Sequence, residues 1–292
     1  MNAATDRTAL AAFLAMSILA GGNAVAIRFS NRELDPLWGA GLRFALAAVL
    51  LGVVMAILRV APPRGRAMTG AVLYGALAIG GAFALAYYGL VRLHAGLAQT
   101  LLALVPLATF FLAVLQRQER LRAGALIGSV LAIAGIGVIS NASLDEGVPA
   151  LSLLAVLGGA LCFAQAAVLV RGLPPVHPVA MNAIGMATGA LLLIGGSIIA
   201  RETIELPDER KTLLALAYLV PVGSVLVFVL YLVVLRYWEA SRASYEFVLI
   251  PVFTVMLSTW LDDEPIGVGL LLGAPLVLAG VYVGALRGTR VG

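Results

Sequence analysis

Long apolar stretches separated by short polar ones dominate this chain. Ten of these stretches are long enough to cross a membrane, since about 20 apolar residues in a helix span the hydrocarbon core. Each is bounded by charged residues or by turn-forming proline and glycine. The predicted spans are residues 8–29, 36–58, 67–91, 95–116, 122–140, 150–170, 178–200, 212–235, 242–261 and 265–286. The pattern therefore predicts an all-α membrane protein with ten transmembrane helices.

Composition supports lipid as the main solvent and excludes several classes of function. Of 292 residues, 62% are hydrophobic and 12% are charged, whereas soluble domains carry about a quarter charged residues. The basic residues stand singly along the chain and include one lysine, Lys211, so we expect no nucleic-acid partner. The single Cys162 allows no intrachain disulfide. His94 and His177 are too isolated for a zinc site, and we expect no metal and no cofactor.

The distribution of arginine and lysine predicts the orientation. Twelve of them fall on the side of the N-terminus and six on the opposite side. Because basic residues collect in cytoplasmic loops, we expect both termini to be cytoplasmic. The expected location is a bacterial-type inner membrane, crossed many times.

The chain contains an internal repeat at an offset of 145 residues. The residues that match at this offset include a proline in mid-span, a glutamate at the end of a span and a Gly-x-x-x-Gly pair. The matches are Pro106 with Pro251, Thr109 with Thr254, Glu119 with Glu264, Gly124 with Gly269, Gly128 with Gly273 and Gly135 with Gly280. Five spans separate the copies, so the halves, residues 1–145 and 146–292, are predicted to be inverted. Inverted repeats with a central site are typical of secondary transporters.

The repeated residues have physical roles. Pro106 and Pro251 lack a backbone N–H and are expected to bend their spans. In a membrane such a bend requires protein or a cavity to satisfy the freed carbonyl. Double glycines recur in spans 1, 3, 6 and 7, and we favour close helix packing over a hinge for them. These are Gly21-Gly22, Gly80-Gly81, Gly158-Gly159 and Gly195-Gly196.

Several short motifs together resemble the EamA family of the drug/metabolite transporter superfamily, and among its members the YddG-type amino-acid exporters. They lie at residues 20–28, which read Ala-Gly-Gly-Asn-Ala-Val-Ala-Ile-Arg, and at residues 36–44, 87–106, 118–120 and 135–138, with the second copy around Pro251 and Glu264. The resemblance implies two inverted five-helix halves and a central cavity walled by spans 1, 3, 4, 6, 8 and 9. It also implies export of small metabolites. Small multidrug-resistance members of the superfamily carry a glutamate in span 1, where this chain has Asn23, so antiport of their type is disfavoured.

Polar side chains within spans are the candidates for substrate contact, because a polar group is costly in hydrocarbon unless it faces the protein interior or a cavity. They are Asn23, Tyr87, Tyr88, Gln99, Thr100, Gln165, Tyr231, Ser244, Tyr245 and Glu246. The amides of Asn23 and Gln165 occupy similar places in the two halves and would bind a carboxylate or an ammonium group. They would equally serve as bridges between helices. The tyrosines would equally belong to the interfacial aromatic belt.

Charged residues in or beside the spans have competing interpretations. Glu246 is the one acid inside a predicted span and would bind an ammonium group or carry a proton. Pairing with Arg242 at the membrane surface is slightly favoured over that role. Arg43 would bind a substrate carboxylate, but a structural role is favoured because span 2 is peripheral in the family. Glu119 and Glu264 are expected to make capping or gate contacts.

The sequence lacks His-Glu-x-x-His, Gly-x-Ser-x-Gly and Walker motifs, so no enzymatic activity is expected. The favoured function is alternating-access export of amino acids, neutral or aromatic and with broad specificity. The alternatives are export of other small molecules such as drugs or nucleosides, and a channel-like facilitator. The expected partners are a small-molecule substrate and the bilayer, with protons as a candidate coupling ion. The oligomeric state stays open and is compatible with a monomer.

Overall fold

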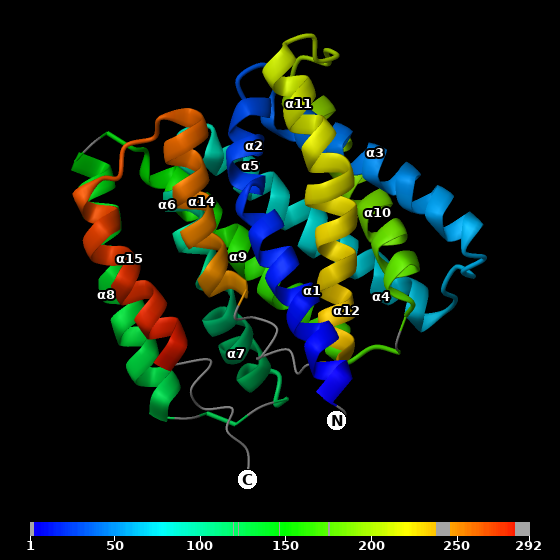
Figure 1. Cartoon of the computed structure of the whole chain (residues 1–292), viewed down its shortest axis with the longest axis horizontal. Coiled ribbons are helices and arrows are strands. Elements are labelled where there is room, and N and C mark those ends of the chain that lie inside the picture. Colours follow the sequence, from blue (N-terminus) through cyan, green and yellow to red (C-terminus); the bar gives the residue numbers. More distant parts are fainter. Residues whose placement is uncertain are drawn as a thin grey trace.

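In the computed structural model the chain is a bundle of helices (Figure 1). The structure describes residues 3–118, 120–121, 123–145, 147–174, 176–237 and 246–283, and none of these residues lies in a strand. Seven helices in this part of the chain are long and apolar enough to cross a membrane. Three shorter apolar helices, Leu126–Ile139, Leu249–Asp262 and Val268–Val281, occupy the remaining predicted spans. The prediction of an all-α membrane protein is confirmed.

The first five spans are formed by residues 3–145. Three of them are interrupted: span 1 at Gly22, span 3 by a π-helical segment and span 4 before a proline. Their elements are α1 (Ala3–Gly21), α2 (Asn23–Ser30), α3 (Pro36–Ile57), α4 (Arg66–Tyr74), η1 (Gly75–Gly81), α5 (Ala82–Leu90), α6 (Ala95–Leu102), α7 (Val105–Leu115) and α8 (Ala123–Asp145).

The second five spans repeat this arrangement. A π-helical segment again interrupts the third span of the half. The elements are α9 (Ala150–Arg171), α10 (Pro178–Ala200), α11 (Arg210–Tyr218), η2 (Leu219–Leu226), α12 (Val227–Tyr237), α14 (Glu246–Asp262) and α15 (Val268–Val281). Adding 145 to the residues of η1 gives 220–226, which falls within η2. The backbone irregularity is therefore part of the repeat, and the sequence analysis did not predict it.

Packing between the halves is symmetric. Equivalent spans face each other: α3 packs on α10, and α8 packs on α15. Contacts between unlike spans occur in equivalent pairs: α5 with α9 and α12 with α1, then α7 with α9 and α14 with α1. Such pairing follows from a pseudo-two-fold relation between two inverted halves.

Glycines at the α8–α15 contact show the same symmetry at the level of single residues. A Cβ added to Gly273 would lie 2.7 Å from the carbonyl oxygen of Gly135, and one added to Gly280 would lie 2.5 Å from that of Gly128. Gly128 and Gly135 are the repeat partners of Gly273 and Gly280. Only glycine allows this approach of two helix backbones, as is common in membranes.

The predicted proline bends differ in form. Pro106 lies in the first turn of α7, directly after the break at residues 103–104 between α6 and α7. Pro251 lies inside α14, which continues through it. The glycine pairs of spans 1 and 3, for which packing was favoured, coincide with changes in helix geometry: Gly21-Gly22 lies at the end of α1 and Gly80-Gly81 lies in η1.

The outer surface of the bundle is apolar. Large aliphatic side chains lie on it at high exposure, for example Val49 at 67% and Ile199 at 84%. A soluble protein rarely leaves so many large apolar side chains in water, so these faces contact lipid.

Candidate functional site

A cavity lies where the two halves meet. Its space, with the opening to solvent included, is about 830 Å³. Its lining residues come from α1 and α2, α5, α6 and α7, α9, α12, and α14. These elements are spans 1, 3, 4, 6, 8 and 9, the six that the family resemblance implied as cavity walls.

Four of the predicted site residues line this cavity: Asn23, Gln99, Tyr231 and Glu246. The other lining residues are apolar, and they include Phe83, Phe163, Phe228 and Phe247. These phenylalanines could not be recognised as site residues from the sequence, because a phenylalanine in a span can face either the lipid or a cavity. The site is therefore a mainly apolar space with a few convergent polar groups, the usual composition of a ligand pocket.

The aromatic lining residues form two groups. Phe163 lies 5.6 Å from Phe247 and 6.3 Å from Tyr231 between ring centroids. Phe83 lies 6.1 Å from Phe228. All of these are within the range of favourable ring contacts, so each group is a packed aromatic wall rather than a set of free rings.

Two further candidates are buried away from the cavity lining. The hydroxyl of Thr100 donates to the carbonyl oxygen of Gly96 at 2.9 Å, within its own helix. The hydroxyl of Tyr87 accepts from Arg43 at 3.5 Å, and its backbone carbonyl accepts from Asn31. Both side chains are therefore buried in the bundle without lining the cavity.

The remaining candidates lie elsewhere. Tyr88 is 45% exposed and faces outward. Gln165 accepts from the amide of Gln116 at 2.9 Å in an exposed position, so the two amides treated as equivalent differ in place. Ser244 and Tyr245 lie outside the described residues.

Arg43, for which a structural role was favoured, lies close to the cavity wall. Its side chain is fully buried in the bundle. The guanidinium donates to the hydroxyl of Ser224 at 2.8 Å and to the carbonyl oxygen of Gly223 at 3.1 Å, both in η2. Its central carbon lies 4.8 Å from the ring centroid of Phe44 and 5.1 Å from that of Phe83, within reach of cation–π attraction. Span 2 thus brings a charge to the back of the cavity wall.

Asn23 connects that charge to the cavity. Its amide donates to the same carbonyl oxygen of Gly223 at 3.2 Å. It can do so because span 1 is interrupted at Gly22, where α2 begins. The carbonyl groups before this break have partners in other spans: Thr254 donates to Gly21 at 2.8 Å, and Tyr218 donates to Leu19. Neighbouring helices therefore satisfy the broken backbone, as hydrocarbon requires.

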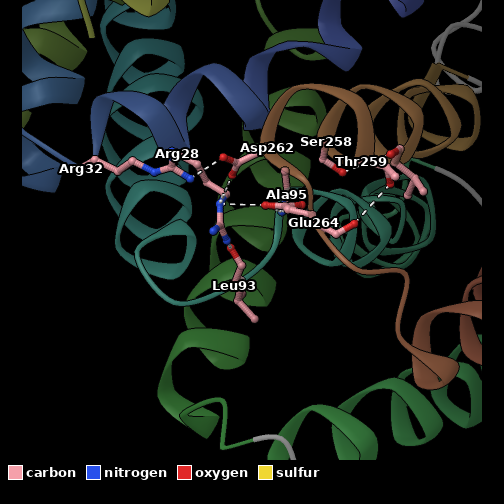
Figure 2. A network of polar contacts seen from close by, with 9 residues as sticks. Arg28, Arg32, Leu93, Ala95, Ser258, Thr259, Asp262 and Glu264 are labelled. Carbon is pink, nitrogen blue, oxygen red and sulfur yellow. Dashed lines mark hydrogen bonds and ion pairs between the residues drawn. The ribbon is translucent and has the colours of Figure 1, made fainter. Parts of the chain in front are cut away.

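A network of ionic contacts joins residues of spans 1 and 9 (Figure 2). The Arg28 side chain lies 2.8 Å from the Glu264 carboxylate and 3.6 Å from that of Asp262, and Arg32 also pairs with Asp262. Glu264 accepts from the backbone N–H of Ala95 at 3.0 Å, at the start of α6. The capping contact predicted for Glu264 is confirmed. Since Ile27, next to Arg28, lines the cavity, the network ties spans 1, 4 and 9 together beside it.

Loops of the two halves are also tied together. Glu33 accepts from the backbone N–H of Asp208 at 2.6 Å and of Glu209 at 3.2 Å. Burial opposes ionisation of Glu33, but the nearby Thr212 hydroxyl and these N–H groups outweigh it and lower the pKa to about 2. The Glu202 carboxylate likewise accepts from the first turn of α3. No helix forms at residues 202–208.

Known proteins similar to this chain are membrane transporters. Residues 7–141 and 150–285 each match the profile of the EamA-like transporter family. The "Probable amino-acid metabolite efflux pump" of Salmonella typhimurium is 29% identical over 93% of both chains. The "Uncharacterized inner membrane transporter YedA" of Escherichia coli K12 is 28% identical over 87% of this chain and 82% of its own. A crystal structure covers all of both chains with a TM-score of 0.69 at 18% identity, which supports the fold alone.

Proposed function

Because the chain belongs to the EamA-like transporter family, we propose that it exports amino acids, neutral or aromatic, by alternating access. The family makes it a membrane transporter and not an enzyme. It is a multi-pass protein of the inner membrane. The identity of the substrate, the direction of transport and its coupling to an ion are our proposal.

The observation that carries the proposal is a cavity at the interface of two inverted halves, lined by six spans. In an inverted repeat, rocking of one half against the other opens the site to alternate sides. The excess of basic residues on the side of the N-terminus supports cytoplasmic termini.

The cavity lining supports an amino acid as cargo. Asn23, Gln99, Tyr231 and Glu246 offer donors and acceptors for the ammonium and carboxylate groups. The four phenylalanines offer apolar surface for an uncharged side chain. The name of the Salmonella relative points to the same substrate class.

The test is transport by the purified chain in liposomes. Labelled leucine and phenylalanine are expected to enter in a saturable way and to show counterflow against unlabelled substrate. Saturable counterflow separates a carrier from a channel-like facilitator. Flux of nucleosides or drugs with none of any amino acid would reject the substrate assignment. Parallel runs with and without a pH gradient test proton coupling.

Two amides provide a matched pair of variants. Asn23→Ala removes a polar group from the cavity, and we expect transport affinity to fall about fivefold, the size of one hydrogen bond. Gln165→Ala removes an amide from the exposed contact with Gln116 and should change affinity less than about twofold. Equal losses in both variants would contradict the assignment of this cavity as the site.

A further inference from the structure

We propose that the cavity is electrically polarised, with Arg43 setting the side on which a zwitterionic substrate places its carboxylate and Glu246 setting the side for its ammonium group. The inference rests on the proposed function and deepens it. It assigns an orientation to the substrate and a role to Arg43, which does not itself line the cavity.

The first observation is a buried positive charge without an acid beside it. Among the residues that the structure describes, every ion pair involves Arg28 or Arg32. All the acceptors of Arg43 are neutral: the Ser224 hydroxyl, the Gly223 carbonyl and the Tyr87 hydroxyl. A buried arginine without a carboxylate carries a large desolvation cost. In a membrane span such a group marks a functional site by default, with a charged partner to be named.

The second observation is that the charge lies directly behind the cavity wall. Phe83 lines the cavity on one side and contacts the guanidinium with its ring on the other, at 5.1 Å. Asn23 also lines the cavity and shares the Gly223 carbonyl oxygen with Arg43. Only one layer of side chains thus separates the cation from the ligand space, and low-polarity surroundings transmit its field further than water would.

The third observation is a buried acid in the cavity lining. Glu246, the first residue of α14, lines the cavity and is 4% exposed. Phe247 and Tyr231 line the cavity with it, and Phe163 contacts both of their rings. Carboxyl oxygens beside aromatic faces are a favourable environment for an ammonium group. The lining in front of Arg43 is instead formed by Asn23 and Phe83, so we expect these two parts of the lining to prefer opposite charges.

A purely structural role is the competing explanation for Arg43, since its hydrogen bonds tie α3 to η2. The two explanations differ in what the charge does to ligands. A structural brace affects every ligand alike. A field from Arg43 favours a carboxylate and disfavours a cation without one.

The experiment measures binding of three ligands to the purified full chain by calorimetry. They are phenylalanine, phenylalaninamide without the carboxylate, and 3-phenylpropionate without the ammonium group, at about pH 6 where the amines are protonated. In the unmodified chain each truncation should weaken binding about tenfold. In Arg43→Gln the loss from removing the carboxylate should disappear while the loss from removing the ammonium group stays. Glu246→Gln should give the reverse pattern, and Arg43→Lys should restore the carboxylate preference.

Each outcome decides the question. Equal weakening of all three ligands in Arg43→Gln would assign Arg43 to structure and overturn the inference. Equal binding of phenylalanine and its amide by the unmodified chain would overturn it even if Arg43→Gln does not fold. Neither result touches the proposed function. Absence of binding by any amino acid to the unmodified chain would reject that function together with the inference.

Discussion

The two π-helical segments occupy equivalent places in the repeat, but different chemistry holds them. In the first half, η1 packs on α10 through glycine. A Cβ added to Gly75 would lie 2.3 Å from the carbonyl oxygen of Gly185, and one added to Gly189 would lie 2.3 Å from Ile79. The backbones meet closely, and no polar side chain fits between them.

In the second half, η2 packs on α3, and Val220 occupies the place of Gly75 in the π-helical segment, 145 residues further along. Arg43 of α3 donates to Ser224 in η2. In α10, by contrast, the hydroxyl of Thr188 donates to Ile184 within its own helix.

The comparison shows which properties the repeat preserves and which it abandons. Backbone geometry is kept, because both halves widen the same span by a π-helical turn. Polarity is not kept, because close glycine backbones form one contact and a buried arginine forms part of the other. A symmetric fold can thus form an asymmetric site, as the proposed zwitterionic substrate requires.

The glycine contact between η1 and α10 is the more sensitive of the two contacts to substitution. Gly75→Val introduces the residue of the second half into the first, where backbone atoms of Gly185 occupy the required space. Because the backbone of a packed helix cannot shift without disturbing its neighbours, we expect the free energy of unfolding to fall by about 1–3 kcal/mol. Thermal unfolding and the monodisperse fraction in detergent measure it. Gly195→Val is the control, since nothing lies within 4 Å of that position; similar behaviour of both variants would show that the contact is not tight.

The Arg28 network is a second contact between the halves that depends on charge. Arg28→Met leaves the Glu264 carboxylate, which is 5% exposed, without its paired cation, while Asp262 keeps Arg32. We expect a loss of about 2 kcal/mol, since breaking a largely buried pair strands the other charge. Arg32→Met removes a 44% exposed side chain from the same network, and it should cost less than about 1 kcal/mol. Unfolding midpoints that order the two variants the other way would refute this account of the network.

Arg43 should respond differently from Arg28 to the same substitution. Arg43→Met removes a buried charge whose acceptors are neutral, so the cost of burying that charge is relieved. We expect thermal stability to change by less than about 1 kcal/mol or to rise, while the affinity for amino acids falls about tenfold. Thermal unfolding with and without ligand measures both quantities. A large loss of stability with unchanged affinity would mean that the contact of Arg43 with η2 is purely structural, like the glycine contact between η1 and α10.

The sequence predicted the fold far better than the site. Periodic apolar stretches and the offset of 145 predicted ten spans within a few residues, because lipid imposes helix length and the repeat imposes packing. It did not predict the π-helical segments, since glycine and valine in a span are compatible with an ordinary helix. It gave Asn23 and Gln165 equal weight because both are amides in mid-span; only the packing of α1, α2 and α9 separates them. A structural role was favoured for Arg43 because span 2 is peripheral in the family, and its hydrogen bonds to η2 could not be predicted because they depend on how α3 packs.

The smallest effect is expected where the loops of the halves meet. Hydrogen bonds to Glu33 lower its pKa from 4.5 to about 2. The stability that its carboxylate contributes is therefore complete above pH 4.5 and is lost as the pH falls toward 2. We expect Glu33→Gln to unfold slightly earlier than the unmodified chain at neutral pH, with a difference that shrinks through this window. Glu205→Gln, in the loop of the second half that Glu33 contacts, is the matched control. A difference that is independent of pH would mean that the side chain's shape, not its charge, joins the loop of the second half to the first.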